Sequence, residues 1–128
     1  LFMAFSEKSI LLIEDEQNIL EALSFILRRA GWNVYTHSNG NDANEVINKL
    51  KPAVVVLDIM LPGKSGFDVL RDLRSSEVGH KTPVMILTAR GQEKDRDAAK
   101  ILGADLFMTK PFVNSEVLNA LEGLFDNE

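Results

Sequence analysis

Residues 52–58, PAVVVLD, decide the fold of this chain. Three valines and a leucine precede the closing carboxylate, Asp58. A continuous apolar run of this kind is typical of a central strand in a parallel sheet, covered by helices on both faces. We therefore expect Asp58 at the tip of a buried strand, where a lone carboxylate indicates a nucleophile or a metal ligand. Taken alone, Asp58 also fits a turn residue, because Asp favours turns.

Four other apolar runs alternate with helical patterns along the chain. A strict alternation of strands and helices requires parallel strands joined by right-handed crossovers. The sequence therefore predicts an α/β fold, a doubly wound (βα)5 three-layer sandwich. The predicted strands are residues 8–14, 32–36, 53–58, 83–88 and 104–109, and apolar residues at helical spacing follow from Ile19, Ala43, Phe67, Ala98 and Val117. The polar run 92–97 is interpreted as a solvated helix face.

Composition limits the class of function. The 128 residues are 45% hydrophobic, which predicts one domain with a sizeable core. Fourteen Lys and Arg against 19 Asp and Glu give a net charge of −5, which argues against direct nucleic-acid contact. Cysteine is absent and no apolar run has the length of a membrane span. We expect one cytoplasmic domain over residues 1–128 without membrane contact, in which residues 1–7 are a tag or a disordered N-terminal extension.

Unusual polar residues follow the ends of four predicted strands. They are Glu14 and Asp15, then Asp58, Thr88 and Lys110. Because the carboxyl ends of parallel strands meet at one edge of a sheet, these residues should converge there. Carboxylates suit a hard divalent cation such as Mg²⁺, while a lysine and a hydroxyl suit a phosphoryl group. The set predicts phosphoryl transfer to a carboxylate.

Each of these residues also has an ordinary structural interpretation. Asp15 fits the N-terminal cap of the first helix, and Thr88 fits the cap of the fourth. Lys110 alone would most often be a solvated lysine. Their joint occurrence at one sheet edge favours a functional site over coincidence.

Four segments together resemble the receiver domain of two-component response regulators, from Lys8 to Leu124. They are residues 10–16 (ILLIEDE), 56–66 (VLDIMLPGKSG), 83–89 (PVMILTA) and 103–112 (GADLFMTKPF). The resemblance implies a chemotaxis-regulator-like, flavodoxin-like fold with a five-stranded parallel sheet of order 2-1-3-4-5. It also implies a signalling domain rather than an enzyme, one that catalyses only its own phosphorylation and slow autodephosphorylation.

The resemblance further implies roles for individual residues. Asp58 looks like the phosphoacceptor, which takes a phosphoryl group from a histidine kinase or a phosphotransfer histidine. Thr88 and Lys110 would bind the phosphoryl group. Family members usually carry a cis bond at this lysine and proline, so Lys110–Pro111 is expected to be cis.

A metal site is implied by the same resemblance. Mg²⁺, for which Mn²⁺ is expected to substitute, would be held by Asp15, by Asp58 and by the backbone carbonyl of Met60. Glu14 would contribute mostly through water.

The implied switch couples Thr88 to Phe107. Thr88 would move toward the phosphoryl group and Phe107 would turn into the space left behind. This would remodel the face formed by the fourth helix, the fifth strand and the fifth helix, where a downstream partner or a missing output domain binds. The chain is expected to be a monomer or a weak homodimer through that face. In the winged-helix class of transcription factors, charged residues at two positions of this face pair across a symmetric dimer. This chain has Leu106 and Ala120 at those positions, so these charge pairs are partly missing.

Three rival functions fit the residues less well. Haloacid-dehalogenase-like phosphatases need an Asp or Thr two residues after the nucleophile, where this chain has Met60. A flavodoxin-like cofactor binder would place phosphate beside Glu14, Asp15 and Glu16, which would repel it. An interaction module that never binds phosphate would be expected to lack one or more of Asp15, Asp58 and Lys110, and all three are present. The sequence does not identify the cognate kinase or the lifetime of the phosphorylated form. It fits a single-domain regulator, the receiver of a truncated transcription factor and the receiver of a hybrid kinase equally well.

Overall fold

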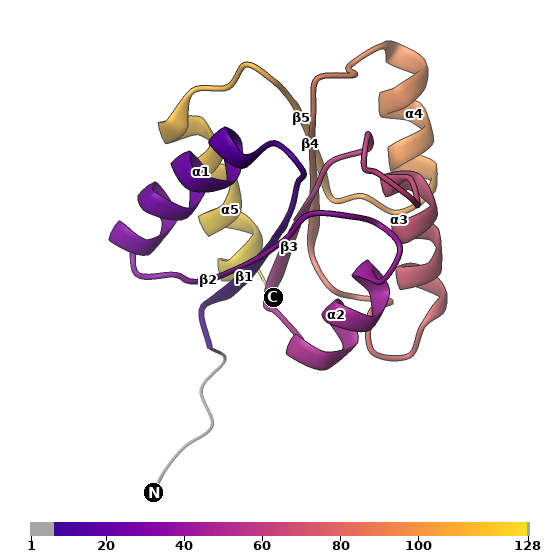
Figure 1. Ribbon diagram of the computed structural model, residues 1–128, viewed down its shortest axis with the longest axis horizontal. Coiled ribbons are helices and arrows are strands. Elements are labelled where there is room, and N and C mark those ends of the chain that lie inside the picture. The colour runs from indigo at the N-terminus through magenta and orange to yellow at the C-terminus, as the bar shows by residue number, and fades with distance from the viewer. Residues whose placement is uncertain (1–6, 128) are drawn as a thin grey trace, which may run out of the picture.

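The computed structural model describes residues 7–127, which form five strands and five helices in alternation (Figure 1). The strands are β1 (Ser9–Ile13), β2 (Asn33–His37), β3 (Val54–Leu57), β4 (Val84–Thr88) and β5 (Leu106–Thr109). The helices are α1 (Gln17–Arg29), α2 (Ala43–Leu50), α3 (Gly66–Ser75), α4 (Glu93–Ile101) and α5 (Asn114–Asp126). The interpretation of residues 1–7 as a tag or extension falls almost wholly on residues outside the described part.

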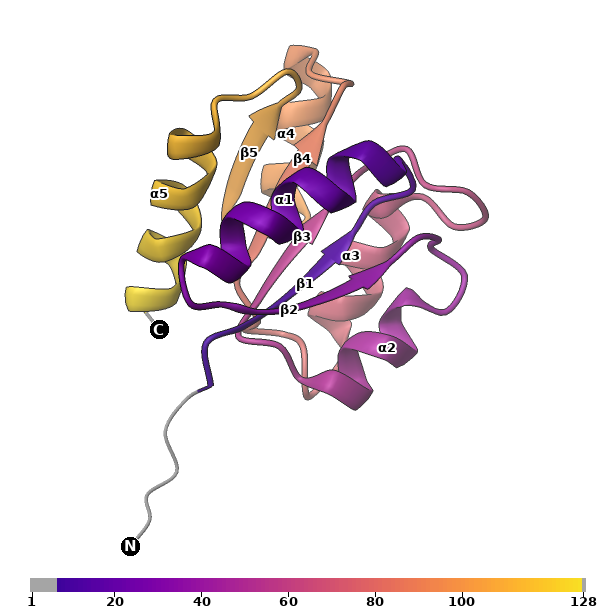
Figure 2. The ribbon, with the colours of Figure 1, turned by 60° about the vertical axis from the view of Figure 1, so that its left-hand side comes forward.

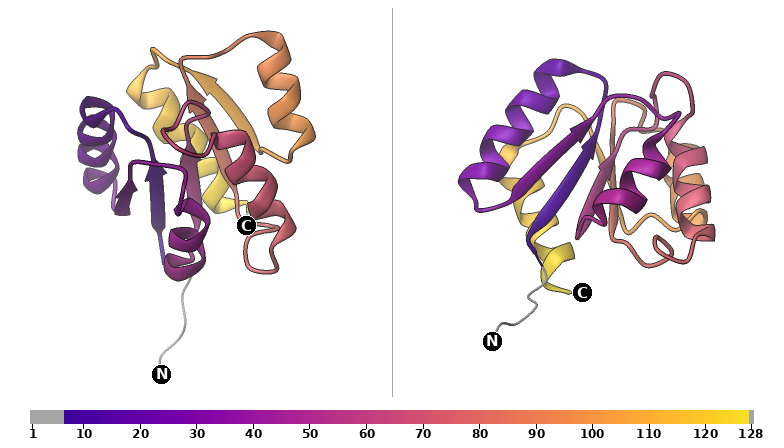
Figure 3. Two further views of the ribbon diagram at one scale, coloured as in Figure 1. Left: turned by 45° about the vertical axis from the view of Figure 1, so that its right-hand side comes forward. Right: turned by 60° about the horizontal axis from the view of Figure 1, so that its bottom comes forward.

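The five strands form one parallel sheet in the order β2-β1-β3-β4-β5. The predicted fold class and strand order are therefore confirmed. Helices α1 and α5 cover one face of the sheet, and α2, α3 and α4 cover the other (Figures 1 and 2). The layered arrangement is also visible in the views of Figure 3. Strand β3, which carries the valine run, is central and buried along its whole length.

Alternate residues of each central strand enter two separate cores. In β1, Leu11 and Ile13 pack with residues of α2, α3 and α4. Their neighbours Ile10 and Leu12 pack instead with residues of α1 and α5. Because successive side chains of a strand point to opposite faces, a strand between two helical layers must be apolar at every position. This explains why the strand sequences are continuous runs rather than alternating ones.

The N-terminal half of α4 corrects one prediction. Residues 92–97 were expected to form a solvated helix face, but Asp95 in the first turn of α4 is only 2% exposed. Its carboxylate accepts hydrogen bonds from the backbone of Gln92 and from the side chain of Arg90. A buried carboxylate requires such partners, and the alternating charges of the run do not reveal them.

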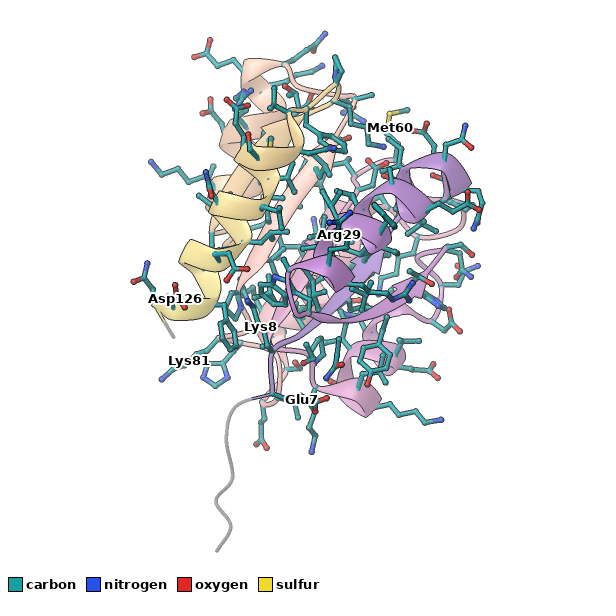
Figure 4. All side chains as sticks on the ribbon, turned by 90° about the vertical axis from the view of Figure 1, so that its left-hand side faces the viewer. Glu7, Lys8, Arg29, Met60, Lys81 and Asp126 are labelled. Carbon is teal, nitrogen blue, oxygen red and sulfur yellow. The ribbon has the colours of Figure 1, made fainter. Side chains whose placement is uncertain are left out.

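The carboxyl ends and the amino ends of the strands lie at opposite ends of the molecule. Met60, which follows β3, lies near one end, whereas Glu7 and Lys81, which precede β1 and β4, lie near the other (Figure 4). Among residues 7–127, no helix combines the length and apolar character needed to cross a membrane. Because all five strands run in the same direction, the residues that follow them lie together at the carboxyl ends of the strands, where the candidate site is found.

Candidate functional site at the carboxyl edge of the sheet

Three charged residues lie together where three of the strands end. Glu14 directly follows β1, Asp58 directly follows β3 and Lys110 directly follows β5. All three are buried: the side chains are 4%, 5% and 8% exposed, in that order. Residues far apart in the sequence thus meet because their strands are parallel and end at one level.

The ammonium of Lys110 lies among three carboxylates. Its Nζ is 2.6 Å from Glu14 Oε1, 3.0 Å from Asp58 Oδ2 and 3.0 Å from Glu16 Oε1. Glu16 differs from the other two because its side chain is 57% exposed. Charge-assisted hydrogen bonds of this kind are stronger than neutral ones. One cation faces three carboxylates, so the cluster retains a surplus of negative charge.

The protonation behaviour of the cluster follows from burial and pairing. Burial alone lowers the pKa of Lys110, but the hydrogen bonds to Glu14, Glu16 and Asp58 outweigh it and raise that pKa above its usual value. Lys110 therefore stays charged at neutral pH. Burial raises the pKa of Glu14, against the opposing effects of Lys110 and of the Glu16 backbone N–H.

Asp58 is held by its own loop as well as by Lys110. Its Oδ1 accepts a hydrogen bond from the Met60 backbone N–H at 3.1 Å. The turn interpretation of Asp58 therefore describes one of its two oxygens, while Oδ2 contacts Lys110. The loop returns tightly at Gly66, where an added Cβ would lie 2.1 Å from the Asp58 carbonyl oxygen. Any side chain at that position would displace the backbone of Asp58.

Asp15 and Met60 line a surface depression beside this cluster. The depression has a volume of about 550 Å³, and Ile59 and Arg90 also contribute to its wall. Asp15 is exposed and does not belong to the group of carboxylates whose oxygens lie within 4.8 Å of one another, which are Glu14, Glu16 and Asp58. Asp15 thus lies outside the cluster of carboxylates around Lys110.

Thr88 and Phe107 occupy neighbouring strands. Thr88 is fully buried at the end of β4, and its carbonyl accepts the Lys110 backbone N–H at 2.9 Å. The Thr88 hydroxyl accepts the Arg90 backbone N–H at 3.3 Å. Phe107 in β5 is half-buried, and the Arg96 guanidinium carbon lies 4.8 Å from its ring centroid. The peptide bond Lys110–Pro111 is cis, as the resemblance predicted.

The ordinary interpretations of these residues find little support. The N-cap of α1 is Glu16 rather than Asp15, and its side chain makes no capping hydrogen bond. The N-cap of α4 is Gln92, so Thr88 does not cap that helix. Lys110 is buried rather than solvated.

The donor set fits a hard divalent cation. The clustered side-chain donors are carboxylate oxygens, and Mg²⁺ and Mn²⁺ accept such ligands together with water. The surplus negative charge around Lys110 would be reduced by such an ion. This edge therefore combines carboxylate oxygens suited to a cation, a buried lysine and a carboxylate that can act as a nucleophile.

Sequence reasoning missed three residues of this edge. Glu16 contacts Lys110, and Arg90 and Asp95 form an ion pair beside the depression. The signal for Glu16 was its place in the acidic run of residues 14–16, directly after β1. For Arg90 and Asp95 the sequence gives no comparable signal, because polar residues at this spacing are common on solvated helices.

Comparison with known proteins places the chain among signalling domains. A model of the response regulator receiver domain matches residues 10–122. The chain is 42% identical over 116 residues to the "probable transcriptional regulatory protein TcrX" of Mycobacterium tuberculosis, covering 91% of this chain and 49% of that protein. The chain thus spans about half the length of this curated relative.

Two solved structures share the fold over nearly the whole chain. One is the fluoroberyllate-activated N-terminal receiver domain of RstA from Klebsiella pneumoniae, with a TM-score of 0.85 and 29% identity over 91% of this chain and 97% of that one. The other is the receiver domain of the sensor histidine kinase PA1611 from Pseudomonas aeruginosa, with a TM-score of 0.86 and 26% identity over 94% of this chain and 98% of that one. The latter has a magnesium ion in its active-site cleft.

Proposed function

Because the chain belongs to the response regulator receiver domain family of two-component signalling, we propose that Asp58 accepts a phosphoryl group from a histidine kinase or a phosphotransfer histidine. The observation that carries this proposal is the contact of Asp58 Oδ2 with the buried Lys110 ammonium, at the edge where the strands end. A carboxylate beside a fixed cation is suited to receive a group whose oxygens carry negative charge.

The reaction forms one bond and breaks one. An Asp58 carboxylate oxygen forms a bond to phosphorus while the bond between phosphorus and the donor histidine nitrogen breaks, and that nitrogen keeps the electron pair. Lys110 then contacts one phosphoryl oxygen, and the Thr88 hydroxyl donates to another. Hydrolysis later returns Asp58 and releases inorganic phosphate. The domain thus catalyses only its own modification.

We assign the metal site of this chain to Asp15, to Asp58 and to the Met60 backbone carbonyl, with Glu14 acting through water. Mg²⁺, or Mn²⁺ in its place, supplies charge neutralisation for the transferred group when bound. The cluster of carboxylates supports the two members of this assignment that belong to it, Glu14 and Asp58, and the receiver domain of PA1611 has magnesium in its cleft. Asp15 lines the depression beside this cluster and is exposed, so its carboxylate is open to an ion from solvent.

The signal leaves the site through Thr88 and Phe107. Thr88 would move toward the phosphoryl group and Phe107 would turn inward, which changes the α4-β5-α5 face. That face carries two large exposed apolar side chains, Ile101 at 84% and Leu106 at 38% exposed. Exposed apolar surface of this kind supports its role as a protein interface. Its proposed occupant is a downstream partner, an output domain or, weakly, a second copy of the chain.

The test is an incubation of the protein with acetyl phosphate and Mg²⁺, read by intact mass. We expect the wild type to gain the mass of one phosphoryl group and Asp58→Asn to gain none. The fluoroberyllate ion, a mimic of the phosphoryl group, should bind the wild type and not Asp58→Asn. A wild type that neither gains mass nor binds fluoroberyllate would overturn the proposal and leave a receiver fold without receiver chemistry.

A further inference from the structure

Arg90 and Asp95 form an ion pair between the loop after β4 and the first turn of α4. Arg90 Nε lies 3.0 Å from Asp95 Oδ1, and the other carboxylate oxygen accepts the Gln92 backbone N–H at 3.2 Å. The two side chains differ in burial, because Asp95 is 2% exposed and Arg90 is 47% exposed. A buried carboxylate is thus held by a cation that water can reach.

The position of Arg90 connects this pair to the candidate site. Arg90 lines the depression of about 550 Å³ together with Asp15 and Met60, and it is the one cationic residue among those that line it. The backbone N–H of Met60 binds Asp58, and the backbone N–H of Arg90 binds the Thr88 hydroxyl. Arg90 therefore lines the same depression as Ile59 and Met60, the two residues that follow the proposed phosphoacceptor in the chain.

The guanidinium has unused capacity to donate. Within residues 7–127 its Nε donates to Asp95, whereas its two terminal nitrogens have no hydrogen-bond partner. Arginine binds phosphate oxygens through parallel N–H groups, which makes phosphate a stronger partner than a single bond to a carboxylate. A phosphoryl group on Asp58 would thus compete with Asp95 for Arg90.

We propose that Arg90 is a second phosphoryl-binding cation, which exchanges Asp95 for the phosphoryl group on Asp58. The inference rests on the proposed phosphorylation of Asp58 and adds a second connection from that site to α4. When Arg90 leaves, Asp95 keeps only its bond to the Gln92 backbone within the described residues. A buried carboxylate that loses its cation is destabilised, so the first turn of α4 loosens. Arg90 thus acts both on the rate of phosphorylation and on the helix that reports it.

The two partners of the pair should have opposite effects on the rate. We expect Arg90→Met to lower the rate of phosphorylation by acetyl phosphate, and the affinity for fluoroberyllate, about tenfold, because a charge-assisted contact to the phosphoryl group is lost. Asp95→Asn should raise both about threefold, because Arg90 is no longer held back. Arg90→Lys, which keeps the charge, should lie between Arg90→Met and the wild type.

A second measurement follows the helix itself. Hydrogen exchange of residues 93–101 should rise when the wild type binds fluoroberyllate. In Arg90→Met it should be high before fluoroberyllate is added and should change little afterwards. In Asp95→Asn, which has no buried carboxylate to lose its cation, exchange should change little when fluoroberyllate binds. Arg90 is half-exposed, so replacing it leaves the core intact, and its variants keep the test available if Asp95→Asn fails to fold.

The exposed pair Arg71–Asp68 on α3 provides the matched control. Arg71→Met and Asp68→Asn remove charges of the same kinds at two residues that do not line the depression. We expect the phosphorylation rate of each variant to stay within about twofold of the wild type. If the wild type is phosphorylated but Arg90→Met and Asp95→Asn change the rate in the same direction, or not at all, the pair is only structural and the inference fails alone. A wild type that is neither phosphorylated nor able to bind fluoroberyllate overturns this inference and the proposed function together.

Discussion

Two cations lie at opposite ends of the strands, Lys110 with a buried side chain and Arg74 with a partly buried one, and their surroundings differ. Lys110 at the carboxyl edge faces three carboxylates. Arg74, at the end of α3, faces one carboxylate, Asp105, and otherwise carbonyl oxygens of the segments that enter β4 and β5. The first centre has surplus negative charge, whereas the second pairs one cation with one anion.

The pKa directions express the same difference. Burial lowers the pKa of Arg74, and the favourable effects of Asp105 do not reverse this. Burial also opposes the charge of Lys110, but three carboxylates raise its pKa overall. The hydrogen bonds of Arg74 hold the loops before β4 and β5 in place, whereas the surplus carboxylates around Lys110 can accept another cation. We therefore expect the charge of Lys110 to serve phosphoryl transfer and the charge of Arg74 to serve stability.

The largest expected effect is on phosphoryl transfer. Lys110→Met should lower the rate of phosphorylation by acetyl phosphate about a hundredfold, because a fixed donor to the developing charge is removed. Arg74→Met should leave the rate within about twofold. Initial rates by intact mass at saturating Mg²⁺ test both. If the two variants lose similar amounts of rate, the proposed division between the edges is wrong.

The next largest effect is on stability, and it belongs to Arg74. Its guanidinium donates to the carbonyls of Gly79, Thr82 and Gly103 and to Asp105, and Asp105 also binds the Val84 backbone N–H at 2.8 Å. Removing the guanidinium leaves several carbonyl oxygens without their charged donor, while Asp105, whose side chain is 44% exposed, can be solvated by water. We expect Arg74→Met to lower the free energy of unfolding by about 2 kcal/mol. Urea denaturation measures it, and a loss below about 1 kcal/mol would mean that water replaces the guanidinium.

A smaller effect is the stabilisation that Mg²⁺ gives. At a concentration ten times its Kd, a bound ion adds about 1.4 kcal/mol to the free energy of unfolding. We expect this gain in the wild type and in Arg74→Met, because the second centre is remote and the effects should add. Asp15→Asn and Asp58→Asn should lose most of it. An equal gain in all four proteins would place the ion elsewhere.

The smallest effect is expected at Glu16. Its carboxylate contacts Lys110 but is more than half exposed, so solvent screens the pair. Glu16→Gln should change the free energy of unfolding by less than about 1 kcal/mol. Urea denaturation of Glu16→Gln beside the wild type measures this. A larger loss would show that Glu16 belongs to the buried part of the cluster.

The sequence predicted the fold well because the central strands β1, β3 and β4 are apolar on both faces. The valine run of β3 and the similar runs of β1 and β4 can be buried only between two helical layers, and parallel direction then brings Glu14, Asp58 and Lys110 together. These consequences depend on periodicity and topology, which a sequence displays.

The remaining features depend on particular side-chain contacts. The polar run of residues 92–97 has the charge pattern of a solvated helix, yet Asp95 is buried because Arg90, five residues away, folds back to it. The partners of Arg74 are mostly carbonyl oxygens, whose positions depend on loop geometry. Neither arrangement follows from residue type or spacing.

The most direct test of the central claim is to locate the phosphoryl group. The protein is incubated with acetyl phosphate and Mg²⁺, reduced with borohydride, which converts an acyl phosphate to an alcohol, and digested for peptide mass spectrometry. We predict reduction at Asp58 and at no other carboxylate, abolished when Mg²⁺ is removed with a chelator and unchanged in Arg74→Lys. Reduction at another residue, or modification of Asp58 that does not depend on Mg²⁺, would contradict the account.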